Sequence, residues 1–212
     1  MPETPYSRND RALTDLTPSP SVDELKKDLR RRAKAVRSEA FAKAGAATAE
    51  TIAGHGIAFA GRNAPAIVSG FLGIGDEIDL TPLMTRLESE GYRLALPVME
   101  GKGKPLVFRA WSPGEPLGET MWGIREPLPT AETVDPDIVL GPLLAFDSRG
   151  YRLGYGGGFY DRTLARLRAL KPIVSIGIAF DEQRVDAVPH VDYDERLDWI
   201  LTPSGPLKCE AA

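Results

Sequence analysis

The segment from Gly150 to Asp161 holds the residues whose types and spacing point most directly to chemistry. It reads GYRLGYGGGFYD, follows an apolar run at Ile138–Phe146 and precedes an amphipathic stretch at Arg162–Leu170. Glycines between a strand and a helix let backbone N–H groups approach a phosphate closely, and the helix N-terminus adds positive potential. An Asp at the start of that helix can hold a magnesium ion on the phosphate. We therefore expect a phosphate-binding loop, and with it a bound nucleotide.

This glycine-rich segment matches neither of two familiar phosphate-binding patterns. No Gly-Lys-Ser/Thr follows it, and its spacing differs from the G-x-G-x-x-G of dinucleotide-binding proteins. A flexible surface turn is the alternative interpretation. Aromatic residues are interleaved with the glycines, where a solvent-exposed turn would be polar, so we favour phosphate binding; they are Tyr151, Tyr155, Phe159 and Tyr160.

A basic segment near the start of the chain is the second candidate. Lys26 and Arg30 are four residues apart, so on a helix they share a face and can clamp one polyphosphate. For most of the basic residues we expect a solvated charged face. Nucleic-acid binding is a further alternative, weakened by the net charge of −4 and the lack of a recognisable reading module. The segment contains Lys26, Lys27, Arg30, Arg31, Arg32, Lys34 and Arg37.

Acidic residues supply candidate metal ligands. A magnesium site needs one or two protein carboxylates, with phosphate oxygens and waters completing the shell. We expect Asp161 to pair with one member of a later acidic group, which without Asp161 would be typical of a solvated loop. That group is Asp192, Asp194, Glu195 and Asp198.

Asp76 and Glu77 follow the first predicted strand, where they either contact a ligand or serve as surface and capping charges.

His55 and His190 are the two histidines, and neither lies near a nucleophile motif. A catalytic triad or a zinc site is therefore disfavoured. The near-absence of acid–base groups of this kind favours chemistry driven by positioning and electrostatics, as in phosphoryl transfer.

Length and composition indicate one α/β domain of ordinary polarity. The chain has 212 residues, 42% hydrophobic and 26% charged, with a single cysteine, Cys209. This excludes a disulfide framework, and no apolar run reaches the length of a membrane span. We expect a disordered leader over residues 1–20, a single domain over 21–204, a tail over 205–212 and a cytoplasmic location.

Hydrophobic spacing predicts the elements that carry these residues. Ser21 and Glu24 have the spacing of a capping box. Helices are predicted from Val22 to about Ala60 with a break near Gly45, over Asp79–Glu90, and over Arg162–Leu170. Strands are predicted within Pro65–Leu72 and over Arg93–Val98, Leu106–Trp111, Ile138–Phe146, Ile173–Ala179 and Trp199–Leu201, with an irregular segment at 112–136.

Strands that alternate with helices imply a mostly parallel sheet covered on both faces. In such sheets ligands collect beyond the C-terminal ends of the strands. The turns after Leu72, Phe146 and Ala179 are therefore the candidate ligand-binding loops.

Taken in order, these segments resemble the 5-formyltetrahydrofolate cyclo-ligase family, also called 5,10-methenyltetrahydrofolate synthetases. The resemblance covers residues 22–202. Its motifs are Lys26-x-x-Leu29-Arg30, Phe71 to Ile78, Trp122 to Pro127, Gly141 to Asp147 with Gly150 to Arg162, and Val188 to Asp198. The chain departs from patterns found in some members at Gly157, Phe159 and Tyr193, where those members carry Lys, Tyr and His.

The resemblance implies a three-layer α/β/α fold of the Rossmann-like NagB/RpiA/CoA-transferase type. It implies ATP- and Mg²⁺-dependent conversion of 5-formyltetrahydrofolate to 5,10-methenyltetrahydrofolate, with release of ADP and phosphate. A divergent member acting on another substrate, and a non-enzymatic nucleotide- or RNA-binding protein, are the alternatives. We expect a monomer that takes a small-molecule substrate and binds neither nucleic acid nor membrane.

The resemblance also implies residue roles. ATP would contact Lys26, Arg30, Arg152, Leu153, Gly154, Tyr155, Gly156, Gly157, Gly158, Phe159 and Tyr160. The folate would contact Leu72, Glu77, Trp122, Tyr155 and Phe159. Catalytic roles fall to Lys26, Arg30, Arg152 and Tyr160, and Mg²⁺ would bind Asp161 and Asp194.

Overall fold

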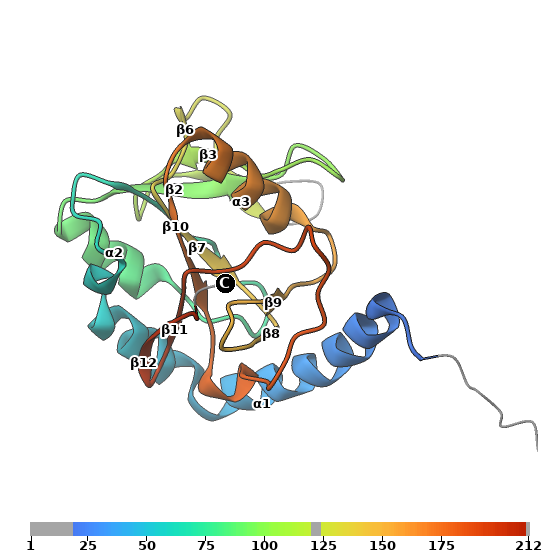
Figure 1. The fold of residues 1–212 in the computed structure, drawn as a ribbon. Coiled ribbons are helices and arrows are strands. Elements are labelled where there is room, and N and C mark those ends of the chain that lie inside the picture. Colours follow the sequence, from blue (N-terminus) through green and yellow to red (C-terminus); the bar gives the residue numbers. More distant parts are fainter. Residues whose placement is uncertain (1–18, 120–123, 211–212) are drawn as a thin grey trace, which may run out of the picture.

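A computed structural model describes residues 19–119 and 124–210 and contains one large sheet with helices on both faces (Figure 1). The predicted leader lies mostly outside the described residues, as does Trp122. The helices are α1 (Val22–His55), α2 (Thr81–Ser89) and α3 (Phe159–Leu170), with short 3-10 helices at Ala58–Ala60 and Asp181–Gln183.

Eight strands form the main sheet in the order β12-β11-β10-β7-β1-β2-β3-β6. The central five, from β11 to β2, are parallel, whereas β12 and β3 join antiparallel at the two sides and β6 pairs antiparallel with β3. The bounds are β1 (Ile67–Ser69), β2 (Arg93–Val98), β3 (Val107–Ala110), β6 (Thr133–Val134), β7 (Ile138–Pro142), β10 (Val174–Ile178), β11 (Trp199–Thr202) and β12 (Gly205–Lys208).

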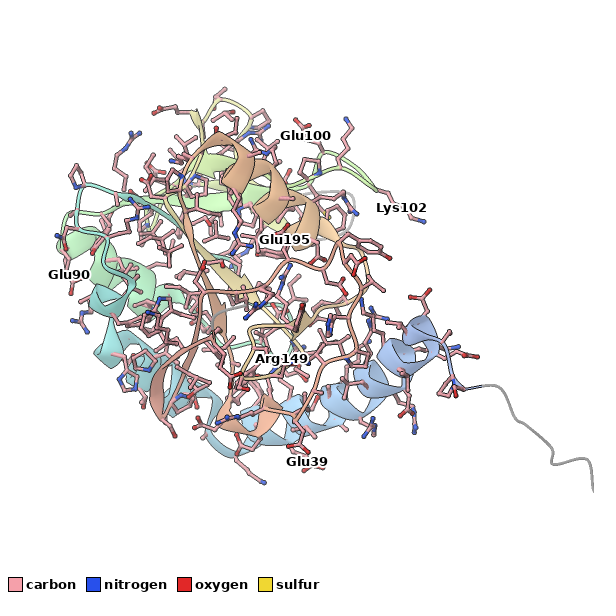
Figure 2. All side chains as sticks on the ribbon, in the orientation of Figure 1. Glu39, Glu90, Glu100, Lys102, Arg149 and Glu195 are labelled. Atoms are coloured by element: carbon pink, nitrogen blue, oxygen red, sulfur yellow. The ribbon has the colours of Figure 1, made fainter. Side chains whose placement is uncertain are left out.

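Alternating side chains divide the core into two apolar layers, which confirms the three-layer α/β/α prediction. On β2, Leu94 and Leu96 pack with α1 and α2, whereas Ala95 packs with α3 on the other face. Charged side chains such as Glu39 and Glu90 lie exposed on the outside of the fold (Figure 2). No helix in the described part of the chain is both long enough and apolar enough to span a bilayer.

The N-terminal half of α1 leaves the main sheet and packs on a small hairpin. The hairpin is formed by β8 (Ala145–Phe146) and β9 (Arg152–Leu153), which pair antiparallel. Leu29 and Ala33 of α1 are buried against it. The predicted capping box is confirmed, because Ser21 and Glu24 satisfy each other's backbone N–H groups. This packing holds the basic face of α1 over the glycine-rich segment.

Several element boundaries differ from the predictions. The expected break near Gly45 is a kink at Ala44, and α1 ends at His55 rather than near Ala60. The Ile138–Phe146 run splits into β7 and β8, because the chain leaves the main sheet after Pro142 to form the hairpin.

The remaining corrections concern short pairings that local sequence does not reveal. The segment at 112–136 is not irregular throughout: β4 (Leu117–Glu119) pairs with β5 (Arg125–Pro127), and β6 extends the sheet. Residues 205–208, expected within a tail, form β12 because they find a partner in β11.

Candidate active site

A cavity of about 700 Å³ lies beyond the C-terminal ends of β1, β2 and β7. This volume suits a small-molecule ligand or cofactor. It collects side chains from α1, the loop after β1, the glycine-rich segment and the loop before β11. The turns after Leu72 and Phe146 lead into it as predicted, whereas the turn after Ala179 contributes none of its lining residues.

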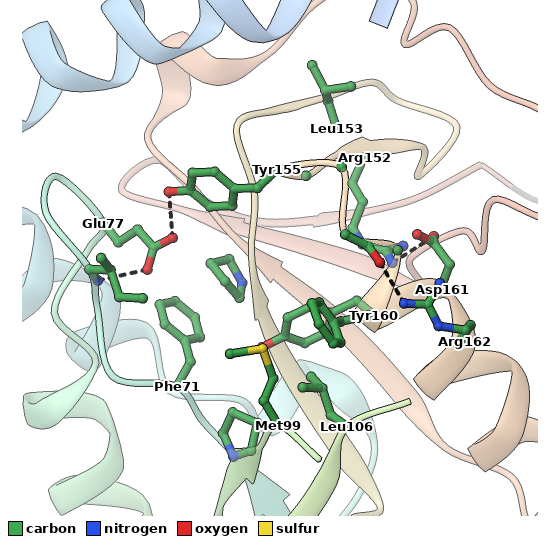
Figure 3. Close-up of a pocket in the computed structure, with 18 of the residues that line it drawn as sticks. Phe71, Glu77, Met99, Leu106, Arg152, Leu153, Tyr155, Tyr160, Asp161 and Arg162 are labelled. Atoms are coloured by element: carbon green, nitrogen blue, oxygen red, sulfur yellow. Dashed lines mark hydrogen bonds and ion pairs between the residues drawn. The ribbon is translucent and has the colours of Figure 1, made fainter. Parts of the chain in front are cut away.

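The cavity has an apolar middle with polar groups at both ends (Figure 3). Phe71, Met99, Leu106 and the ring of Tyr160 form the apolar part. The ring of Tyr160 packs so closely on β7 that a Cβ at Gly141 would lie 3.2 Å from it. Burial raises the pKa of Tyr160, which keeps its hydroxyl protonated at neutral pH.

One polar end is built around Glu77. Its carboxylate accepts hydrogen bonds from the backbone N–H of Ile74 and the hydroxyl of Tyr155, both at 2.9 Å. Burial raises the pKa of Tyr155 to about 12, so this hydroxyl remains a donor at neutral pH. Glu77 is therefore held by two donors at the edge of the cavity.

Arg37 completes this end of the cavity from behind. The expectation of a solvated basic face holds for Lys27 and Lys34 but is wrong for Arg37, which is only 4% exposed. Its guanidinium donates to the Tyr155 hydroxyl at 2.6 Å, pairs with Asp76 and lies 3.5 Å from Glu77 Oε1. The missed signal was spacing, since position 37 continues the helical face that carries positions 26 and 30.

Lys26 and Arg30 reach the other polar end from α1. Both line the cavity, as their shared face predicted. Lys26 forms an ion pair with Asp194, and Arg30 Nε donates to the backbone oxygen of Gly154 at 2.9 Å. These contacts join the N-terminal part of α1 to the glycine-rich segment and to the loop that carries Asp192, Asp194 and Glu195, here called the acidic loop.

Arg152 and Asp161 form a second ion pair at this end. Arg152 Nη2 lies 2.9 Å from Asp161 Oδ1, which also accepts the backbone N–H of Glu195 at 3.2 Å. Burial lowers the pKa of Arg152, and the attraction of Asp161 opposes that effect. The pair joins α3, β9 and the loop that carries Asp194.

The two predicted metal ligands both line the cavity. Asp161 uses Oδ1 for its hydrogen bonds, and Asp194 uses Oδ2 for Lys26 and the N–H of Val191. The second oxygen of each carboxylate makes no hydrogen bond within residues 19–119 and 124–210. Two such oxygens suit a Mg²⁺ ion that keeps phosphate and water ligands, so the donor set fits the metal.

The other acidic residues of the later group do not face the cavity. Glu195 and Asp198 form ion pairs with Arg168 of α3. Among the described residues no cluster of three or more His, Cys, Asp or Glu side chains is arranged to hold a metal. Asp194 is therefore the member of that group that remains beside Asp161.

Asp147 organises the loops around the site and was not assigned a role from sequence. Its buried carboxylate accepts backbone N–H bonds from Arg149, Tyr151 and Val188 at 3.0 to 3.2 Å. These bonds tie the β8–β9 hairpin to the segment that leads to Asp194. The sequence predicted a turn after Phe146, but neither the hairpin nor the contact of Asp147 with Val188 was predicted, because both depend on the fold.

Within the described chain, all residues to which the resemblance assigns a ligand contact line this one cavity, whereas Asp76, for which a ligand contact was one of two alternatives, pairs with Arg37 and does not line it. The set comprises Lys26, Arg30, Leu72, Glu77, Arg152 to Tyr160, Asp161 and Asp194. Trp122 lies outside the described residues. Arg162 also lines the cavity and was not predicted. Which ligand each residue contacts stays a prediction.

Fold and cavity define an α/β protein with a ligand-sized cavity that is lined by cationic side chains at one end, and comparisons with known proteins identify its family. Residues 22–203 match the profile of the "5-formyltetrahydrofolate cyclo-ligase family". The chain belongs to that family and is an enzyme of the ligase class.

Individual relatives agree with this assignment. The chain is 37% identical to the 5-formyltetrahydrofolate cyclo-ligase of Escherichia coli K12 over 142 residues, covering 65% of this chain and 78% of that protein. It is 35% identical to the enzyme of that name from Mycolicibacterium smegmatis over 144 residues, covering 64% and 73%. The solved structure of Aquifex aeolicus 5,10-methenyltetrahydrofolate synthetase superposes with a TM-score of 0.69 at 26% identity, covering 89% of this chain and 94% of that one.

Proposed function

We propose that this enzyme uses ATP and Mg²⁺ to convert 5-formyltetrahydrofolate to 5,10-methenyltetrahydrofolate, releasing ADP and phosphate. One observation carries the proposal. A single cavity has an apolar middle, a carboxylate–tyrosine pair at one end, and a glycine loop with cations and two carboxylates at the other (Figure 3). The apolar middle with the Glu77–Tyr155 end suits a pterin ring, the end with the glycine loop suits a polyphosphate, and the reaction needs the two ligands close together.

The chemistry needs positioning more than acid–base groups. The formyl oxygen attacks the γ-phosphorus of ATP, a P–O bond forms there, and the bond from γ-phosphorus to ADP breaks. N10 of the same folate then attacks the activated carbon and gives up its proton to water or to the departing phosphate, and the C–O bond breaks to release phosphate. Because both partners are bound, correct orientation replaces a bimolecular encounter and contributes an effective molarity of up to about 10⁵–10⁸ M.

Folate positioning and phosphate binding fall to residues at opposite ends of the cavity. Glu77 and Tyr155 orient the folate, while Phe71 and Met99 exclude water from its ring. At the other end Arg30 and the loop N–H groups bind phosphate oxygens and stabilise charge that develops during transfer.

Mg²⁺ would be held by Asp161 and Asp194, and when bound it would neutralise phosphate charge. Lys26 would then have a phosphate oxygen as an alternative partner to Asp194. A monomeric state and a cytoplasmic location stay predictions.

The direct test is formation of methenyltetrahydrofolate, followed by its absorbance. Purified protein mixed with 5-formyltetrahydrofolate should generate the product only when both ATP and Mg²⁺ are present. Omission of either, and replacement of ATP by a non-hydrolysable analogue, serve as controls. Absence of turnover at saturating ATP and Mg²⁺ would refute the proposal. ATP hydrolysis with another formylated compound, but not with this folate, would identify a divergent substrate.

A further inference from the structure

The positive charges that line the cavity are neutralised unevenly. Lys26 pairs with Asp194, and Arg152 pairs with Asp161. The cavity also contains arginines that form no ion pair with any residue in the described ranges, namely Arg30, Arg125 and Arg162. An anionic ligand would therefore meet its strongest uncompensated positive charge at these side chains.

Arg162 is fixed against the glycine-rich segment by several contacts. Its Nη2 donates to the backbone oxygen of Gly157 at 2.6 Å, and its guanidinium carbon lies 5.5 Å from the centre of the Phe159 ring. A Cβ at Gly158 would lie 2.7 Å from Nη1. The guanidinium thus lies directly beneath the loop (Figure 3).

Most of the donors of this guanidinium are still unused. Arg162 Nε is buried and has no hydrogen-bond partner within the described chain. An arginine carries five N–H donors, and a buried donor without a partner is unfavourable. Because Nη2 makes one bond and Arg162 lines the cavity, the remaining N–H groups of Nη1 and Nη2 are the donors that a ligand oxygen would meet.

Arg30 holds the same loop from the α1 side. Besides its bond to Gly154, it approaches Gly156 so closely that a Cβ there would lie 3.4 Å from the guanidinium. The loop is therefore bracketed by two guanidiniums, each of which binds one loop carbonyl. In addition, the N-cap of α3, Gly158, provides no side-chain cap for the first N–H groups of that helix.

We propose that Arg162 is a phosphate-binding residue that contacts the terminal phosphates of the nucleotide. The inference rests on the proposed use of ATP. Gly157 has no side chain to bring charge to the middle of the loop, and Lys26 is partnered by Asp194. Arg162 brings that charge from α3, and a planar guanidinium suits phosphate oxygens well.

Binding measurements on the whole protein test this role without turnover. Calorimetry with ATP, ADP and AMP, in the presence of Mg²⁺ and without folate, is compared for the native chain and for Arg162→Met and Arg162→Lys. Methionine keeps an unbranched stem beside Phe159 and removes the charge. Arg166→Met is the matched control, because Arg166 lies one turn further along α3, pairs with Asp135 and does not line the cavity.

We expect Arg162→Met to weaken ATP binding by about 10- to 100-fold and AMP binding by much less, because charge-assisted hydrogen bonds to the outer phosphates are lost. Arg162→Lys should recover part of the loss, and Arg166→Met should bind ATP like the native chain. If the methionine variant does not fold, the lysine variant should still lose more affinity for ATP than for AMP.

Two results would overturn the inference while leaving the proposed function intact. One is unchanged ATP affinity in Arg162→Met. The other is an equal loss for ATP and AMP, which would assign Arg162 a purely structural role in shaping the loop. A native protein that binds no ATP would instead contradict the proposed nucleotide dependence, and this inference with it.

Discussion

Asp194 is the residue at which α1, the acidic loop and the proposed metal meet. It accepts the ammonium of Lys26 and the N–H of Val191 through Oδ2. An asparagine could retain an oxygen acceptor for these donors but would lose the negative charge. The role of Asp194 can therefore be separated from the folding of its loop.

We predict that Asp194→Asn lowers turnover by at least about 100-fold at saturating ATP, since the site loses an anionic ligand of the proposed Mg²⁺ that neutralises the reacting phosphate. Asp192→Asn is the matched control, because Asp192 is exposed on the same loop and does not line the cavity. The measurement is product absorbance over a Mg²⁺ titration. Equal turnover of the two variants would contradict the assignment of Asp194.

Arg37 provides a second test at the scale of one residue. Burial alone would raise the pKa of Asp76, but hydrogen bonds from Ser38 and Arg37 outweigh it, so the pKa lies below its usual value. Arg37 thus stabilises an ionised carboxylate while it also supports Glu77 and Tyr155.

We predict that Arg37→Met lowers the free energy of unfolding by about 3 kcal/mol, because it leaves the buried Glu77 and the partly buried Asp76 without their cation. Urea unfolding at neutral pH measures the loss. Arg37→Lys, which keeps the charge, should lose less. Native-like stability of the methionine variant would show that the cluster contributes little to folding.

At the scale of elements, Asp137 joins the start of β7 to two neighbours. Its Oδ2 accepts the N–H of Ile67 in β1 at 2.8 Å, and its Oδ1 lies 2.8 Å from the ammonium of Lys171 after α3. Burial alone would raise the pKa of Asp137, but the bonds from Lys171 and Ile67 outweigh it and the net pKa is lowered. The depressed pKa stabilises the fold above the unfolded-state value near 3.9 and loses this effect as pH falls through the folded-state value.

We predict that Asp137→Asn costs about 1 kcal/mol of unfolding free energy at pH 7, a value reduced for the partial exposure of the ion pair. The difference from the native chain should begin to shrink as pH falls below about 3.9, where the unfolded chain takes up the proton, and should vanish below the lowered pKa of the folded state, where Asp137 is neutral in both states. Urea unfolding at a series of pH values checks this. A difference independent of pH would mean that ionisation of Asp137 does not stabilise the folded chain.

That the glycine-rich segment lines the cavity was predictable, because the residues that suggested a site are consecutive in the sequence. Its glycines, its aromatic residues and Asp161 all lie within Gly150–Asp161, whereas the helix start was predicted three residues too late, because α3 begins at Phe159 rather than at Arg162. The places where the sequence misled are pairings between distant segments. The contacts of Arg37 with Tyr155 and of Asp147 with Val188 depend on how the elements pack, and neither partner marks the other in the sequence.

At the scale of the whole molecule, the parallel centre was predictable and the sheet edges were not. Runs such as Arg93–Val98 are apolar enough to indicate buried strands, and β2 has these bounds. By contrast, β6 and β12 are short and half exposed, so their pairing is decided by the neighbouring strand.

We predict that removing residues 205–212 lowers the midpoint of thermal unfolding by at least about 5 °C and promotes aggregation, because the edge of β11 becomes unpaired. The deletion also removes the bonds from Cys209 N to Asp198 O and from Glu210 N to Ser148 O, both 3.0 Å. Differential scanning calorimetry with light scattering measures both effects. An unchanged midpoint would show that β12 adds little to the sheet.

The ion pair between Lys26 and Asp194 has a consequence for synthesis of the chain. Its partners are 168 residues apart, and at roughly 5–20 residues per second a ribosome needs about 8–34 s to add the second after the first. During that interval Lys26 lacks its ion-pair partner, and for most of it Leu29 and Ala33 lack the hairpin against which they pack. The N-terminal half of α1 is thus secured only after the hairpin and the loop that carries Asp194, both made later, have left the ribosome.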